Sequence, residues 1–188
     1  MSAAHVTRAR HTPAVRLVPA SARYEAAFLA AVRESRALHR PWVSLPATHA
    51  GFRAYLKAKS GPRNLAYLVL SAAGDLVGVV SVNEIVRGVF RSGYLAYCAF
   101  VPHHRRGFMR AAVARVVTHV FRREGLHRLE ANIQPSNVAS IRLVRRLGFR
   151  REGRSPRYLK IGGRWRDHER WAITREDWRP ATRRRGAD

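Results

Sequence analysis

The change of hydrophobic period at residue 108 constrains the fold of this chain more than any other feature of its sequence. From Phe108 to Gly125, apolar residues recur at intervals of three and four with arginines between them, which predicts one amphipathic helix with a single buried face. The preceding segments are rich in Val, Tyr and Leu and are separated by turn residues, as is typical of strands. They span 66–70, 76–86 and 93–101. We therefore expect three antiparallel strands that lead into a core-facing helix.

Further elements are predicted on both sides of this central block. Gly148 stands where a glycine commonly follows the end of a helix, and Gly162-Gly163 favours a two-residue hairpin turn. The predicted order is β-αα-βββ-α-β-α-ββ in one domain over residues 14–178, with disordered ends over 1–13 and 179–188. The additional elements are strands at 15–18, 129–133, 158–161 and 165–173, and helices at 24–38, 52–60 and 135–147.

The charge balance indicates a polyanionic partner or a coding bias. The 188 residues include 36 Lys or Arg against 12 Asp or Glu, a net charge of +24, and only three of the basic residues are lysines. Arginine favours bidentate phosphate contacts, although a GC-rich genome produces the same excess. Ribosome or rRNA contact through a basic surface is one expectation from this charge.

The single cysteine, Cys98, excludes an intramolecular disulfide and a cysteine-based zinc site. We expect it to be a buried strand thiol in a protein of the reducing cytoplasm. The sequence also contains neither an apolar run of about 18 residues nor an apolar leader, so no membrane association is expected.

The segment Val101-Pro-His-His-Arg-Arg-Gly-Phe-Met109 joins a predicted strand to the long helix. Backbone N–H groups and the positive end of the helix dipole suit a pyrophosphate there, and Gly107 permits close backbone approach. Arg105 and Arg106 would add positive charge. An ordinary strand–turn–helix connection with a solvated basic face has the same features, so both interpretations stay open.

A second motif begins at Asn132 and runs through Asn137 and Ser140 to Leu147-Gly-Phe149. Asn137 and Ser140 are three residues apart in one predicted helix and therefore lie on the same face, where they could meet one ligand. The bare chemistry is ambiguous, because Asn137 is also a good N-cap and Ser140 is also simply a small helical residue.

Taken together, these motifs resemble the GCN5-related N-acetyltransferase (GNAT) family, whose α/β fold has a mixed, mostly antiparallel sheet split near its middle with helices on both faces. The loop is similar to the family's pyrophosphate loop, [Q/R]-x-x-G-x-[G/A], with departures at His104 and Met109. The spacing from Asn137 and Ser140 to the Leu-Gly-Phe triplet is similar to the family's coenzyme-binding helix. The resemblance implies acetyl-coenzyme A as cosubstrate and no metal. The residues that it assigns to the coenzyme are Ala99, Phe100, Val101, His104, Arg105, Arg106, Gly107, Phe108, Met109 and Asn137.

Residues 126–180, and above all the block Gly-Gly-Arg-Trp-Arg-Asp-His168, resemble the subgroup that acetylates N-terminal amines of ribosomal proteins. Many GNAT enzymes have a Tyr acid four residues after the position of Ser140, where this chain has Val144. The subgroup similarly lacks it, which implies that Ser140 is the general acid. Arg157 departs from relatives that have an acidic residue there. The resemblance implies an acetyltransferase whose partner is a protein N-terminus, that of a ribosomal protein.

Glu84 is the candidate general base, because it places a carboxylate at the end of an otherwise apolar strand. An edge-strand salt bridge to one of the many arginines is the alternative explanation. Asp167 and His168 are alternatives, but adjacent strand residues point to opposite faces and do not share one pocket easily. The substrate candidates are Trp42, Asn83 and Tyr97.

Two other functions stay compatible with the sequence. One keeps the fold and changes the acceptor to a small-molecule or drug amine, since fold fixes the donor better than the acceptor. The other is a catalytically inactive, basic module that binds RNA or the ribosome, for which the net charge of +24 and the missing Tyr at position 144 are the supporting features.

Overall fold

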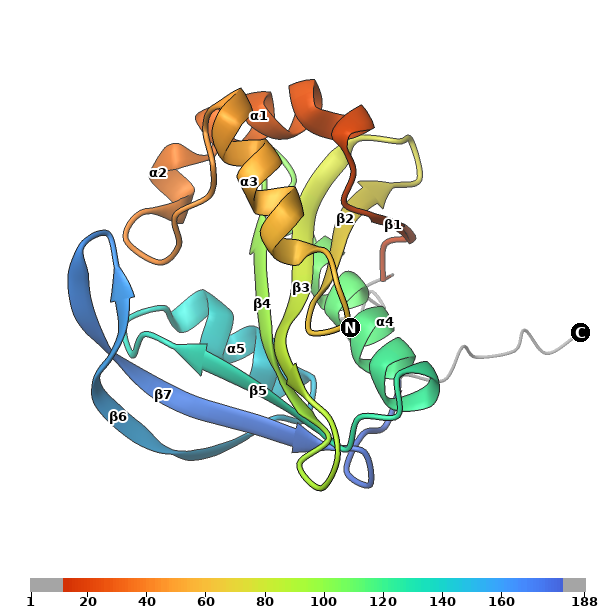
Figure 1. Cartoon of the computed structure of the whole chain (residues 1–188), viewed down its shortest axis with the longest axis vertical. Coiled ribbons are helices and arrows are strands. Elements are labelled where there is room, and N and C mark those ends of the chain that lie inside the picture. The colour runs from red at the N-terminus through yellow and green to blue at the C-terminus, as the bar shows by residue number, and fades with distance from the viewer. Residues whose placement is uncertain (1–11, 181–188) are drawn as a thin grey trace, which may run out of the picture.

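Seven strands form one sheet in the order β1-β2-β3-β4-β5-β7-β6. The computed structural model describes residues 12–180; most of the two ends predicted to be disordered lies outside this range. The observed order of strands is the predicted one, whereas the helix predicted at 24–38 is divided into three shorter helical elements. Figure 1 shows helices on both faces of the sheet. The elements are β1 (Val15–Pro19), η1 (Ala22–Tyr24), α1 (Glu25–Glu34), α2 (Arg36–His39), α3 (His49–Lys59), β2 (Leu65–Ser71), β3 (Leu76–Val86), β4 (Ser92–Ala99), α4 (Phe108–Arg123), β5 (Arg128–Ile133), α5 (Val138–Arg146), β6 (Arg150–Ile161) and β7 (Arg164–Thr174).

The sheet is split between β4 and β5. Strands β1 to β4 pair antiparallel, and so do β5, β7 and β6. Between these two groups, β4 and β5 pair in parallel over three residues only, Ser92–Tyr94 against Arg128–Glu130. Beyond Tyr94 the two strands separate, as Figure 1 shows. The backbone groups of β4 beyond this point therefore face a gap and not a neighbouring strand.

Two clusters of buried side chains hold helices against opposite faces of the sheet. The amphipathic face of α4 packs with residues of β3, β5 and β7 in the larger cluster, which includes Val80, Val116 and Leu129. Helices α1 and α3 pack on the other face through Phe28 and Phe52. None of the helices within residues 12–180 is long and apolar enough to cross a membrane.

Strand β6 begins at Arg150, eight residues earlier than predicted. Its first half consists of polar residues and glycine, so no apolar alternation marks it as a strand. The register with β7 shifts between Ser155 and Leu159, and within this bulge Arg157 has a φ of 48°. The Asp167 carboxylate accepts a hydrogen bond of 2.9 Å from the Arg157 N–H, which assigns Asp167 a structural role.

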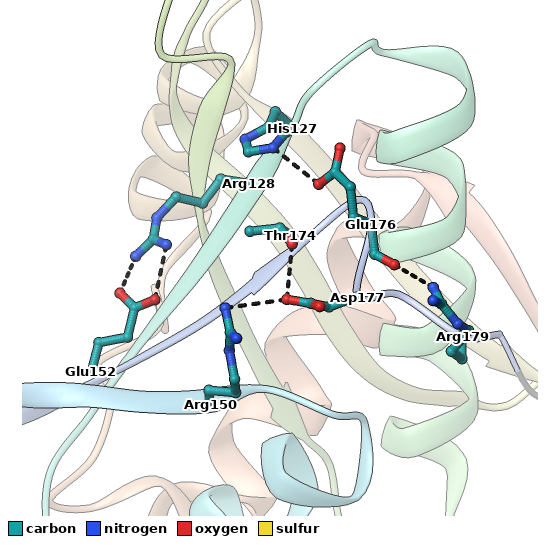
Figure 2. Close-up of polar contacts among 8 residues, drawn as sticks. All are labelled: His127, Arg128, Arg150, Glu152, Thr174, Glu176, Asp177 and Arg179. Carbon is teal, nitrogen blue, oxygen red and sulfur yellow. Dashed lines mark hydrogen bonds and ion pairs between the residues drawn. The ribbon is translucent and has the colours of Figure 1, made fainter.

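Ion pairs close the end of the sheet where β5 begins and β7 ends (Figure 2). His127 lies 3.0 Å from Glu176, Arg150 lies 3.2 Å from Asp177, and Arg128 contacts both carboxylate oxygens of Glu152. The acidic side chains at this end thus already have partners among the basic side chains of the chain.

Candidate active site

The backbone of β4 offers hydrogen-bonding groups to the gap beside it. Alternate residues of an antiparallel strand direct their N–H and C=O groups to opposite sides. The Phe100 N–H donates to the Val77 carbonyl at 2.9 Å, and Ala99 lies opposite Gly78. The N–H groups of Ala99 and Tyr97 therefore point toward the gap, where they could bind an extended ligand.

Two amides assigned to the coenzyme from sequence do not fit this geometry. The Phe100 N–H is bonded to β3 and its side chain is fully buried. The Val101 N–H donates to the Ser35 hydroxyl at 3.0 Å. Of the three residues Ala99, Phe100 and Val101, the first alone presents its amide to the gap. The predicted strand boundaries do not reveal which backbone N–H groups already have partners, and coenzyme contact by other atoms of these residues stays a prediction.

The loop before α4 has the chemistry of an anion site. Gly107 precedes the helix with a φ of 88°, and Arg105 also adopts a positive φ of 61°. The first amides of a helix have no partner within it, so the N–H groups of Phe108 and Met109 are directed out of the N-terminus of α4. This arrangement suits a diphosphate.

The side chains of this loop either lie where a ligand could contact them or pack into the core. Within the described residues, the Nδ1 atoms of His103 and His104 are buried without a hydrogen-bond partner, so a bound ligand could engage them. Arg105 and Arg106 are exposed beside them and add positive charge. The Met109 side chain instead lies in the core, which leaves only its amide to face a ligand.

Ser140 meets Tyr97 across the gap. The Tyr97 hydroxyl lies 2.6 Å from the Ser140 Oγ, which joins β4 to α5. Burial raises the pKa of Tyr97, so this hydroxyl stays protonated and can donate to Ser140. The Ser140 proton is then free to be donated elsewhere. The structure thus brings together two residues that the sequence assigned to different roles, an acid and a substrate contact.

Asn137 caps α5. Its side-chain oxygen accepts a hydrogen bond of 3.1 Å from the Ser140 N–H, as an N-cap residue does. The side-chain NH₂ group of Asn137 is not used by this bond and could bind a ligand. The capping alternative drawn from the sequence is therefore correct, and coenzyme contact by Asn137 stays a prediction.

The opposite face of β4 has a separate polar surface. Asn83 and Tyr94 are cross-strand partners and share this face, and Lys59 of α3 donates to the Asn83 side chain. Burial lowers the pKa of Lys59. Asn83 and Tyr97 therefore lie on different faces of the sheet, so an acceptor touching Asn83 approaches the gap from the side opposite Ser140.

The loop between α2 and α3, which carries Trp42, is fastened to both edges of the gap. The His39 Nε2–H donates to the Ala99 carbonyl on β4 at 2.9 Å. From the other edge, the Gln134 side chain donates to the Pro41 carbonyl at 3.2 Å. These contacts place Trp42 near the gap. Nothing in the sequence pattern marks His39 or Gln134, because each contact joins segments at least 60 residues apart.

Glu84 lies in an irregular part of β3 where the register with β4 shifts. It has a φ of 48°, its side chain is 60% exposed, and it forms an ion pair of 2.5 Å with Arg63. This is the salt bridge that the sequence allowed as the alternative. A role as base requires the Glu84 carboxylate to leave Arg63 or to act through water.

His168 is the second candidate for proton transfer. It is only 3% exposed, and its Nδ1 lies 2.9 Å from the Arg166 carbonyl. A proton on Nδ1 satisfies that carbonyl and leaves the lone pair of Nε2 free. Burial lowers the pKa of His168, which keeps the ring neutral, and Tyr158 packs edge-on against it.

Comparison with known proteins shows the family of this chain. A family model described as "Acetyltransferase (GNAT) domain" matches residues 15–150. The chain belongs to the GNAT family. Among solved GNAT structures it resembles "Mycobacterium smegmatis RimJ in complex with CoA-disulfide", with a TM-score of 0.81 and 27% identity over 88% of this chain and 84% of that one.

Two curated relatives match a shorter stretch. The chain is 38% identical to the [Ribosomal protein uS5]-alanine N-acetyltransferase of Escherichia coli over 56% of this chain and 55% of the relative. It is 36% identical to the "Probable N-acetyltransferase YjcK" of Bacillus subtilis over 58% of this chain and 61% of the relative. The chain thus matches little more than half the length of these curated relatives.

Proposed function

We propose that this protein is an acetyl-coenzyme A-dependent N-acetyltransferase that modifies the N-terminal α-amine of a protein, with a ribosomal protein as acceptor. The observation that carries the proposal is the Ser140–Tyr97 contact of 2.6 Å at the gap between β4 and β5. It supplies a proton donor beside the strand amides that would hold a thioester. The Escherichia coli relative, which is named for acetylation of ribosomal protein uS5, supports the choice of acceptor.

The chain's own residues suit each part of the coenzyme. The N-terminal amides of α4, with the left-handed Gly107, would hold the diphosphate, and Arg105 and Arg106 would add electrostatic attraction. The Ala99 and Tyr97 amides would bind the pantetheine arm, and one of them would polarise the thioester carbonyl.

The transfer step needs two proton movements. The neutral amine attacks the thioester carbon, the C–N bond forms, and the C–S bond breaks to release the coenzyme thiolate. Ser140 donates its proton to this sulfur while the Tyr97 hydroxyl donates to the Ser140 Oγ, which stabilises the developing serine oxyanion. The nitrogen of the new amide loses its extra proton to water, and water returns a proton to Ser140, so the net transfer is one proton from the amine to the coenzyme sulfur.

The amine itself needs only a weak base. A free α-amine has a reference pKa near 7.7–8.0, about 2.5 units below that of lysine, so a substantial fraction is neutral at physiological pH. Glu84 is the proposed base, acting through water. His168 is the alternative because its neutral ring has a free Nε2.

Mass spectrometry tests the acceptor class. Ribosomal proteins incubated with the enzyme and acetyl-coenzyme A should gain one acetyl group at a single N-terminus. Acetylation of small amines without any change in the proteins would overturn the choice of acceptor, and coenzyme binding without transfer to either would overturn the assignment as an enzyme.

Glu84→Gln distinguishes the two bases. The variant should lose activity near pH 7 and regain it toward pH 9, because the amine is then already deprotonated. A wild-type rate at pH 7 would instead reassign Glu84 to its ion pair with Arg63.

A further inference from the structure

The end of the molecule away from the coenzyme loop forms a distinct surface, here called the basic pole. It comprises the turn between β3 and β4 (residues 87–91), the last turn of α4 with Arg122 and Arg123, the start of β5, and Arg175 after β7. These segments lie together at the bottom of Figure 1. Backbone bonds join them: His127 N–H donates to the Arg91 carbonyl, and Arg175 N–H donates to the His127 carbonyl.

Apolar side chains project from the basic pole into solvent. Val89 is 96% exposed and Phe90 is 70% exposed, although neither helps to cover the core. Beside them is a pocket of about 280 Å³ lined by Arg87, Gly88 and Arg91 of the turn and by residues 124–126. An exposed aromatic ring next to a pocket is typical of a surface that binds a partner.

The acidic residues of the basic pole are already paired, which leaves its arginines in excess. Glu124 contacts Arg87 and His119, and the carboxylates in Figure 2 are held by Arg128, His127 and Arg150. Among the described residues, no carboxylate pairs with four exposed arginines of this surface. These are Arg91, Arg122, Arg123 and Arg175.

We propose that the basic pole binds single-stranded RNA, with Phe90 stacking on a base and the neighbouring arginines contacting phosphates. A protruding aromatic ring among guanidinium groups matches the two requirements of such binding, a stacking platform and a cationic track. Arginine adds planar, bidentate contacts to phosphate. The choice of RNA over another polyanion rests on the proposed function, because a ribosomal acceptor would bring the enzyme to RNA.

The basic pole and the coenzyme loop can be occupied together. They lie at opposite ends of α4, whose 16 residues span about 24 Å. RNA held at the pole would leave the gap between β4 and β5 open. The pole would thus increase the local concentration of enzyme around acceptors in a ribonucleoprotein without touching the reacting atoms.

Fluorescence anisotropy with a labelled single-stranded RNA of mixed sequence tests the proposal on the full chain. Phe90→Ala should weaken RNA binding about tenfold, the loss expected for one stacked base. Replacing Arg91, Arg122 and Arg123 with Ser should weaken it further and lower the slope of log affinity against log salt by about two, since each phosphate contact contributes about 0.7.

Trp165→Ala is the matched control, because this exposed Trp lies between two arginines at the start of β7, next to a hairpin turn but outside the basic pole. It should leave RNA affinity unchanged. Coenzyme-induced thermal stabilisation, measured on each variant, should match that of the wild-type chain and so confirm that the fold is intact.

Wild-type RNA affinity in Phe90→Ala, or equal losses in Phe90→Ala and Trp165→Ala, would overturn the proposal. So would tighter binding to vesicles containing phosphatidylserine than to RNA. Acetylation of free N-terminal peptides is measured separately. RNA binding through the basic pole without peptide acetylation would overturn the proposed function and leave the RNA surface supported.

Discussion

Removing the Tyr97 hydroxyl tests how the proton donor works. In the Tyr97→Phe enzyme, the Ser140 Oγ loses the hydrogen bond of 2.6 Å that would stabilise it as it gives up its proton. A buried hydrogen bond of this kind contributes about 1 kcal/mol net, which corresponds to roughly a fivefold fall in kcat. Ser140→Ala removes the donor itself, so kcat should fall by at least about tenfold.

The double variant supplies the decisive measurement. If Tyr97 acts only through Ser140, the Tyr97→Phe substitution should cost nothing further once Ser140 is Ala, and the coupling energy should equal the whole effect of Tyr97→Phe, about 1 kcal/mol. Release of the coenzyme thiol gives kcat and KM for the four enzymes. Coenzyme affinity, measured by calorimetry, should be nearly unchanged in Ser140→Ala.

Tyr67→Phe is the matched control, because Tyr67 is a partly buried tyrosine of β2 whose pKa is likewise raised by burial but which lies outside the site. It should leave kcat unchanged. Independent, additive losses from Tyr97→Phe and Ser140→Ala would refute the relay. Equal weakening of coenzyme affinity by both would make the pair a binding feature and leave the acid unassigned.

Three further outcomes are expected. Saturating acetyl-coenzyme A should raise Tm by about 5–10 °C. Gly107→Ala should reduce this rise, because the backbone φ of 88° at Gly107 strains any side chain. The same rise in the variant as in the wild-type chain would place the phosphate site elsewhere. Asn137→Ala should lower stability by about 1 kcal/mol through loss of the N-cap and also weaken coenzyme affinity, whereas a change in calorimetric stability alone would limit Asn137 to capping. Because burial lowers the pKa of His168, the imidazole of the unfolded chain takes up its proton first as pH falls below about 6.5. The free energy of unfolding should therefore decrease there by at most about 1.4 kcal/mol per pH unit for this group. His168→Gln should flatten that part of a Tm–pH curve, and an unchanged slope would contradict a neutral buried ring.

Periodicity was sufficient to predict the elements that bury one face. The helix beginning at Phe108 and the hairpin at Gly162-Gly163 both carry patterns set by their own residues. The first half of β6 carries no such pattern, because its polar residues owe their strand conformation to pairing with β7. That pairing is a tertiary interaction, and no local sequence pattern predicts it.

The candidate site was predictable in its parts and not in its assembly. The loop glycine and the Asn137–Ser140 spacing are local features, and the resemblance to a family gave them a role. The contact between Tyr97 and Ser140 joins residues 43 apart in sequence and depends on where β4 leaves β5. The occupied amides of Phe100 and Val101 likewise depend on register and on a serine in a distant helix.

The three residue pairs that join β4 to β5 have a consequence for how the molecule unfolds. Because the pairing between β4 and β5 is so short, the backbone amides of β1–β4 and those of β5–β7 should exchange with deuterium at different free energies of opening, as two cooperative units do. A ligand lying between them would contact both units and penalise the separate opening of either. Bound coenzyme should therefore slow amide exchange across both halves of the sheet, well beyond the amides that it touches. The two halves should then open as one cooperative unit.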